Sequence, residues 1–186
     1  MPSGKNIFEL FADILSYPTP QYHAKLAVWS QRMEAYGEEI NSSLQPFKDF
    51  VASKTSQELE EFFTQTFDIN PVSCLEIGWH LFGESYDRGA FLVRMRELLR
   101  THGIPESSEL PDHINHVLLI LARMEKTDAS EFTHAQILPA VRKMLAGFEN
   151  KENVYERTLQ SLCAVLEAEF PKSIDPRVEL HQNHLK

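Results

Sequence analysis

Apolar residues recur at three- and four-residue spacing through most of this 186-residue chain, and this spacing restricts the fold more than any other feature. It fills one face of a helix, whereas a half-buried strand needs strict alternation. Alternating runs longer than a few residues are absent, as are the Asn-Gly and Asp-Gly turns of hairpins. We therefore expect an all-α, single-domain bundle of about eight to nine helices, over 6–16, 21–36, 38–53, 88–102, 129–147 and 152–169, with others after Thr55, Asn70 and Pro111.

Local signals place several helix ends. Thr55 and Glu58 have the spacing of a capping box, and Asp128 with Glu131 resembles a second one. Asn70-Pro71 predicts the start of a helix that is apolar nearly all round and therefore lies at the centre of the core. Pro46 and Pro139 fall inside helical patterns, where Pro46 predicts a break and Pro139 a kink or a fresh start.

Length and composition indicate one globular domain over residues 1–170, followed by a polar C-terminal tail over 171–186. The net charge of -9 argues against a nucleic-acid partner and against docking on an anionic membrane. No apolar stretch approaches the roughly 20 residues that a membrane span needs, and no signal-peptide core follows the N-terminus. The expected location is the cytoplasm, with Cys74 and Cys163 as buried, reduced thiols.

Two densely polar turns, Gly83–Gly89 and Glu109–His113, flank one amphipathic helix. Loops usually use Ser, Asn and Gly at such places, but these turns carry acidic, basic and imidazole side chains. One interpretation is solvated capping, in which Asp87 caps the following helix and Asp112 favours a helix dipole. The other interpretation is the lip of a binding groove, and the local sequence leaves both open.

Catalytic and metal-binding patterns are sparse. A di-iron site in a helical bundle needs two Glu-x-x-His pairs, and only Glu131 with His134 fits. His113 and His116 share a helix face but have no third ligand near them in sequence. No nucleophile elbow, phosphate-binding loop or dinucleotide motif occurs. The sequence thus predicts no enzyme, no catalytic residues, no metal and no cofactor.

Five groups of residues together resemble the NarJ-type nitrate reductase assembly chaperones, within the TorD/DmsD group of redox-enzyme maturation proteins. They follow the family's order across residues 15–155: Leu15-Ser16-Tyr17-Pro18; Phe67-Asp68 with Asn70-Pro71; Gly83-Glu84-Ser85-Tyr86-Asp87-Arg88-Gly89; Glu109-Leu110-Pro111-Asp112-His113; and Leu138-Pro139 with Glu152-Asn153-Val154-Tyr155. The two polar turns are the specific part of this match. The chain departs from the family at Val154, where proline is usual, and at Tyr86, where arginine or a similar residue is common.

The resemblance implies a non-enzymatic chaperone that binds the N-terminal peptide of a molybdopterin oxidoreductase catalytic subunit, with nitrate reductase as the expected client, until cofactor is inserted. It further implies a monomer or weak dimer with no nucleic-acid partner and no direct membrane insertion. Acidic side chains would form a negative rim for a basic peptide, and aromatic ones an apolar floor. The expected client-peptide-binding residues are Trp79, Glu84, Tyr86, Asp87, Arg88, Phe91, Glu109, Asp112 and His113.

Individual roles follow within this hypothesis. Arg88 is expected to hold its loop by pairing with a carboxylate. His113 is expected to bond a client carbonyl, or to make affinity depend on pH near neutrality. Asp112 and His113 are both expected at an exposed rim. Two alternatives remain open: a helical protein–protein adaptor with no molybdoenzyme client, and a metal-dependent helical enzyme.

Overall fold

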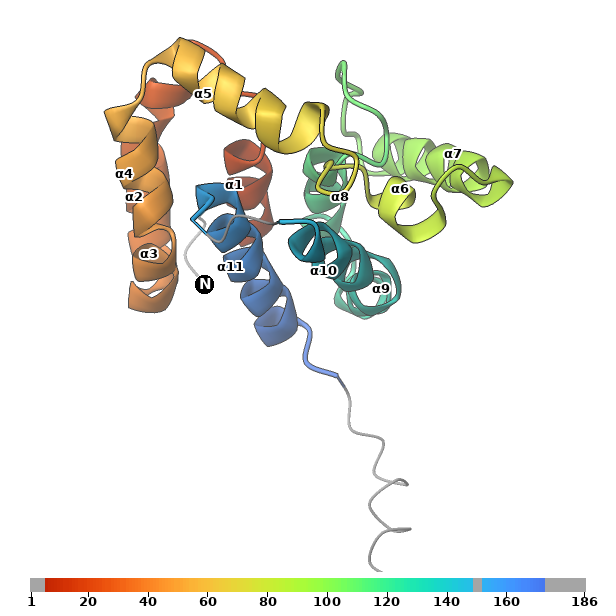
Figure 1. Cartoon of the computed structure of the whole chain (residues 1–186). Helices are drawn as coiled ribbons and strands as arrows, with labels where there is room; N and C mark the ends of the chain where they lie inside the picture. Colours follow the sequence, from red (N-terminus) through yellow and green to blue (C-terminus); the bar gives the residue numbers. More distant parts are fainter. Residues whose placement is uncertain (1–5, 149–151, 173–186) are drawn as a thin grey trace, which may run out of the picture.

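The computed structural model describes residues 6–148 and 152–172, and within them the chain is entirely helical apart from loops and one isolated bridge (Figure 1). The all-α expectation is confirmed. The α-helices are α1 (Ile7–Ile14), α2 (Tyr22–Tyr36), α3 (Glu38–Ser43), α4 (Gln45–Ser53), α5 (Ser56–Phe63), α6 (Ile77–Phe82), α7 (Tyr86–Thr101), α8 (Ile114–Leu121), α9 (Lys126–Phe132), α10 (Leu138–Ala146) and α11 (Val154–Glu169). Two π-helical turns, η1 (Thr64–Asp68) and η2 (Thr133–Ile137), extend α5 and connect α9 to α10.

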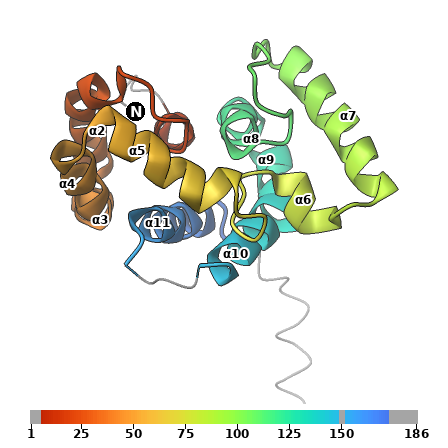
Figure 2. The same ribbon diagram turned by 45° about the horizontal axis from the view of Figure 1, so that its top comes forward.

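The helices form two groups joined through the centre of the molecule. Helices α2, α3 and α4 lie at one end and α6 to α10 at the other, while α1 and α11 lie between them (Figures 1 and 2). Helix α5 with η1 crosses from the first group to the second. Helix α1 packs against α8, and α11 packs against α3, α4 and α10, so the core is continuous from one end to the other.

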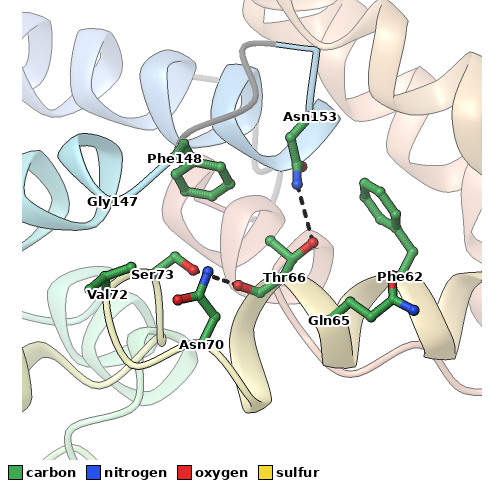
Figure 3. Close-up of a pocket in the computed structure, with 9 residues that line it drawn as sticks. All are labelled: Phe62, Gln65, Thr66, Asn70, Val72, Ser73, Gly147, Phe148 and Asn153. Carbon is green, nitrogen blue, oxygen red and sulfur yellow. Dashed lines mark hydrogen bonds between the residues drawn. The ribbon is translucent and has the colours of Figure 1, made fainter.

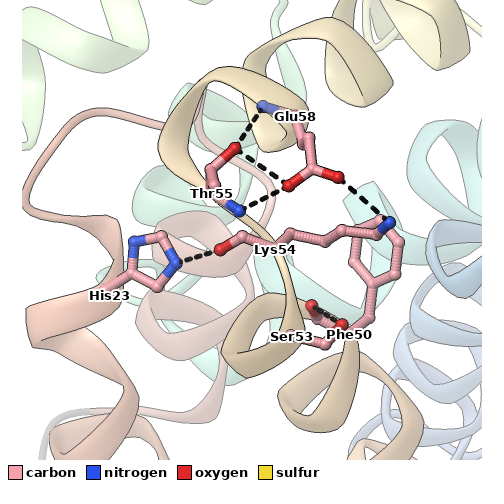
Figure 4. Close-up of polar contacts among 6 residues, drawn as sticks. All are labelled: His23, Phe50, Ser53, Lys54, Thr55 and Glu58. Carbon is pink, nitrogen blue, oxygen red and sulfur yellow. Dashed lines mark hydrogen bonds and ion pairs between the residues drawn. The ribbon is translucent and has the colours of Figure 1, made fainter.

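The predicted capping box at the start of α5 is confirmed. The Thr55 hydroxyl accepts the backbone N–H of Glu58, and the Glu58 carboxylate accepts the backbone N–H of Thr55 at 2.8 Å (Figure 4). Lys54 extends this contact by pairing with Glu58 at 3.4 Å, and its carbonyl lies 2.7 Å from Nε2 of His23 on α2. The turn between α4 and α5 is thereby tied to α2.

The other predicted helix boundaries are partly correct. Pro46 stands in the first turn of α4 and Pro139 in the first turn of α10, so both mark fresh starts. The second capping box is wrong, because α9 begins at Lys126 and Asp128 lies inside its first turn. Residues 70–76, expected to be helical, form turns and a bridge.

Helix α6 is shorter and less central than the sequence indicated. It starts only at Ile77, and Ile77 and Gly78 are its buried residues. Phe82 is 36% exposed, so the expectation of a helix at the centre of the core is wrong. That place belongs to α1 and α8, which pack against each other through mostly buried residues.

The two cysteines are less buried than the sequence predicts. Cys74 and Cys163 are free and half-buried, and burial raises their thiol pKa values to about 12 and about 11. Among the described residues, no helix is long and apolar enough to span a membrane. The expected polar tail lies outside the described residues from position 173 onward.

Candidate functional site

The Glu109–His113 turn is joined to the loop before α6 by backbone hydrogen bonds between segments far apart in the chain. The N–H of Ile77 donates to the carbonyl of Asp112 at 3.0 Å, and the N–H of Ile114 donates to the carbonyl of Leu75 at 2.9 Å. These two bonds form the antiparallel bridge between Glu76 and His113. The segment leading into α6 and the segment leading into α8 therefore hold a fixed relative position.

Asp112 lies inside this junction and is not exposed at all. Its Oδ2 accepts the backbone N–H of Gly78 at 2.9 Å, while Oδ1 has no hydrogen-bond partner in the described part of the chain. Burial raises the pKa of the carboxyl above its usual value; the Gly78 hydrogen bond and the charge of Arg88 only partly oppose this. The expectation of an exposed Asp112 at a rim is wrong, because its buried carboxylate accepts a backbone N–H from another segment of the chain.

His113 is also buried, with 5% of its surface exposed. It is the N-cap of α8, and its Nδ1 accepts the backbone N–H of Asn115 at 3.3 Å. Burial lowers its pKa to about 3, so the imidazole is neutral near pH 7. The expectations of an exposed side chain and of a pH response near neutrality are therefore both wrong.

His116 follows one turn later and is held internally. Its Nε2 lies 3.1 Å from the Ser107 hydroxyl, and its Nδ1 lies 2.9 Å from the carbonyl of Leu110. Both ring nitrogens thus have protein partners. Within residues 6–148 and 152–172, no group of three or more His, Cys, Asp or Glu side chains is arranged to hold a metal ion.

The Gly83–Gly89 turn presents its acidic and aromatic side chains to solvent. Gly83 has φ +58°, a left-handed conformation that ends α6 without the strain a side chain would add. Glu84, Tyr86 and Asp87 are exposed, and Tyr86 is 93% exposed. Asp87 does not cap the next helix as predicted, because α7 starts at Tyr86 with Ser85 in the N-cap position.

Arg88 and Trp79 connect α7 to α6. The guanidinium of Arg88 lies 5.3 Å from the centre of the Trp79 ring, a cation–π arrangement. Trp79 Nε1 donates to the carbonyl of Pro71 at 2.8 Å, which ties the loop before α6 to the helix. Among the described residues Arg88 has no carboxylate within ion-pair distance, so the expected pairing is replaced by stacking.

Phe91 is buried rather than available as a groove floor. It is 5% exposed and packs against Phe82, with ring centres 5.4 Å apart. Its ring also faces Gly78, so it fills the space between α6 and α7. Of the aromatic residues expected to contact a ligand, the structure leaves Tyr86 exposed and Trp79 half-buried.

Glu109 belongs to an acidic cluster with Asp68 and Glu76. Burial raises the pKa of its carboxyl, and the nearby charges of Asp68 and Glu76 raise it further. These three carboxylates come from the end of η1, the loop before α6 and the loop before α8. Phe67-Asp68 is part of the family resemblance, but no local pattern groups Asp68 or Glu76 with Glu109, because the three carboxylates come from separate segments.

Comparisons with known proteins place this geometry in a family context. The family model described as nitrate reductase delta subunit matches residues 34–160. The Bacillus subtilis (strain 168) protein named "Probable nitrate reductase molybdenum cofactor assembly chaperone NarJ" is 26% identical over 162 residues, covering 86% of this chain and 88% of that protein. The Escherichia coli (strain K12) nitrate reductase molybdenum cofactor assembly chaperone NarJ is 26% identical over 152 residues, covering 76% of this chain and 61% of that protein.

A solved structure has the same fold. It is titled "Crystal Structure Of A Putative Redox Enzyme Maturation Protein From Archaeoglobus Fulgidus". It matches with a TM-score of 0.64 and 21% identity, covering 90% of this chain and 96% of that one. The likeness therefore extends over nearly the whole of both chains.

Proposed function

This chain belongs to the nitrate reductase delta subunit family, and from that membership we propose that it is a system-specific chaperone for a molybdoenzyme catalytic subunit, most simply that of a nitrate reductase. It would bind the subunit's N-terminal segment and hold the subunit for cofactor insertion and assembly. The names of the Bacillus and Escherichia relatives, both cofactor assembly chaperones, support this role. Family membership also agrees with the expectation of a protein that does not catalyse a reaction.

The observation that carries the proposal is the bridge between the loop before α6 and the Glu109–His113 turn. The bridge fixes the start of α6 against the loop that carries the half-buried Glu109. Helix α6 then leads directly into the turn that exposes Glu84, Tyr86 and Asp87. Asp112 and His113 lie beneath that junction and position it rather than touching a ligand. A buried frame with acidic and aromatic groups outside it suits the capture of a peptide that carries basic and apolar residues.

Helical binding of the client is the simplest arrangement. An amphipathic helix would lay its apolar face beside Tyr86 and Trp79 and direct its basic residues to Glu84, Asp87 and Glu109. The departure at Tyr86 from the family pattern then concerns a residue in direct contact with the client. We further propose one domain over residues 1–170, a cytoplasmic location, and a monomeric or weakly dimeric state.

The experiment is calorimetric titration with synthetic peptides of about 25 residues, long enough for an amphipathic helix. The peptides represent the N-termini of the molybdoenzyme catalytic subunits encoded in the same genome. We expect one peptide to bind and its affinity to fall as salt is raised, because exposed charge pairs are screened. Failure of every peptide to bind would overturn the peptide-capture mechanism and favour an adaptor without such a client.

A charge-matched pair of variants locates the site. Glu84→Gln with Asp87→Asn removes two exposed carboxylates from the turn, and we expect affinity to fall about threefold to tenfold. Glu34→Gln with Glu39→Gln removes two exposed carboxylates from α2 and α3, at the other end of the molecule. Equal losses in both variants would show that net charge, and not this turn, attracts the peptide.

A further inference from the structure

A small cavity lies where the π-helical turn η1, which ends at the cluster residue Asp68, meets the loop after it and the start of α11 (Figure 3). Its volume is about 350 Å³, near the lower end of the range for ligand pockets. Two segments singled out in the sequence, at Asn70 and at Asn153, contribute to its wall. The function proposed above gives neither of them a role.

The cavity wall is fixed by backbone and by paired side chains. Gly147 lies so close to the loop that a Cβ there would stand 2.3 Å from the carbonyl oxygen of Val72. Ser73 donates from its hydroxyl to the carbonyl of Thr66, and Asn153 Nδ2 donates to the Thr66 hydroxyl at 3.2 Å. Asn153 Oδ1 accepts the backbone N–H of Tyr155 at 2.9 Å. The space is therefore built into the fold.

The chemistry of the wall selects an uncharged occupant. Phe62 and Phe148 supply aromatic rings, and the other side chains that line the cavity are neutral. Asn70 is half-buried, and in the described part of the chain its side-chain amide makes no hydrogen bond. A primary amide offers one carbonyl acceptor and two N–H donors, which match the N–H and C=O of a peptide group. A charged group would be desolvated here without a partner.

The loop from Asn70 to Glu76 connects this cavity to the acidic cluster. Its first residues line the cavity, and its last one is a cluster carboxylate held by the bridge. Asp68, another cluster member, stands two residues beyond Thr66 on η1. A single peptide can therefore place a basic residue on the cluster and an apolar residue in the cavity.

We infer that this cavity receives one uncharged aromatic or long aliphatic side chain of the client segment, with an adjoining peptide group bonded to Asn70. The inference rests on the proposed function and deepens it, because it adds a requirement on the client sequence. Basic residues alone do not define the client. An apolar residue must lie within reach of the basic ones.

The test is titration of Asn70→Asp with the N-terminal peptide that binds the wild-type protein. The change keeps the shape of the side chain but removes its N–H donors and adds a negative charge among aromatic rings. We expect affinity to fall about tenfold in a protein that stays folded at the titration temperature, although desolvation of the new carboxylate lowers its unfolding midpoint. Gln31→Glu, which adds the same charge on exposed surface of α2, is the control and is expected to leave affinity unchanged.

A second arm identifies the client residue. Each apolar residue of the peptide is replaced by alanine in turn and titrated against the wild-type protein and Asn70→Asp. We expect one position whose replacement weakens binding to the wild type markedly but to the variant much less, since the two changes remove one shared contact. No such coupled position would overturn the assignment of the cavity.

The outcomes separate the two proposals. If no catalytic-subunit peptide binds the wild-type protein, both the proposed function and this occupant are overturned. If a peptide binds and Asn70→Asp binds it equally well, only the cavity assignment is overturned. Tighter binding by Asn70→Asp would also overturn it, because the cavity would then be receiving a basic residue.

Discussion

The backbone N–H of Gly78 donates a 2.9 Å hydrogen bond to Oδ2 of Asp112, a residue 34 positions further along the chain. This contact leaves no room for a side chain at position 78. A Cβ there would lie 2.6 Å from Oδ2 of Asp112 and 2.8 Å from Cδ1 of Phe91. The close approach of α6 to the loop before α8 therefore requires glycine.

Gly78→Ala is expected to lower the free energy of unfolding by about 1–3 kcal/mol, the usual cost of overpacking a tight site. The control is Gly89→Ala on α7, where a Cβ would meet nothing within 4 Å. Alanine there should raise stability by about 0.5–1 kcal/mol, because it favours the helix. Urea unfolding of both variants measures the two effects. A Gly78→Ala protein as stable as the wild type would contradict the described geometry.

Asp112→Asn is expected to gain stability relative to the wild type as the pH rises. The folded-state pKa of Asp112 is raised, so the folded protein holds this proton more tightly than the unfolded chain does. Wild-type stability therefore falls as the pH climbs from the ordinary carboxyl pKa of 3.8 through the raised folded value. Asparagine does not titrate. Unfolding of both proteins from about pH 4 to pH 7 measures the difference; a constant difference would mean that the pKa is not raised.

His113→Asn is expected to lessen the loss of stability in acid. The folded-state pKa of His113 is lowered from 6.5 to about 3, so the unfolded chain takes up a proton first as the pH falls. The wild type thus loses stability from pH 6.5 down to about 3, and an asparagine, itself a favoured N-cap, removes this contribution. Acid unfolding profiles test this. A variant with the wild-type profile would show that another group causes the loss of stability in acid.

Trp79 is expected to be the tryptophan that an external quencher reaches. Trp29 is completely buried, whereas Trp79 is half-buried at the surface beside Arg88. Acrylamide should therefore quench the tryptophan fluorescence that comes from Trp79, and Trp79→Phe should remove this quenchable component. A bound client peptide should shield it. Quenching that survives the substitution would show that Trp29 is reached by solvent.

Local sequence signals predict those helix starts that depend only on residues close together in the chain. The Thr55–Glu58 capping box and the fresh starts at Pro46 and Pro139 are short-range effects, and the structure has all three. Asn70-Pro71 carries an equally good start signal, but no helix begins there. The backbone of Leu75 and Ile77 bonds instead to residues 112–114, and this tertiary pairing outweighs local preference.

The candidate site was harder to predict for the same reason. Charged and imidazole side chains are normally exposed, so Asp112 and His113 were placed at a rim. Asp112 is buried because it accepts a backbone N–H from another segment, and His113 because it caps α8 from within. The proximity of Asp68 to Glu109 is a tertiary relationship between separate segments, and neither local sequence predicts it.

The packing of α1 on α8 has a consequence for how this protein is made. Helix α1 leaves the ribosome long before α8, because most of the other helices lie between them in the chain. Until α8 emerges, the apolar face of α1 has no native partner, so the nascent chain is prone to aggregation. A fragment cut to the family match, residues 34–160, would lack α1 and leave α8 uncovered. A protein proposed to shelter unfinished enzymes would itself need its distant helices α1 and α8 together before its core can form.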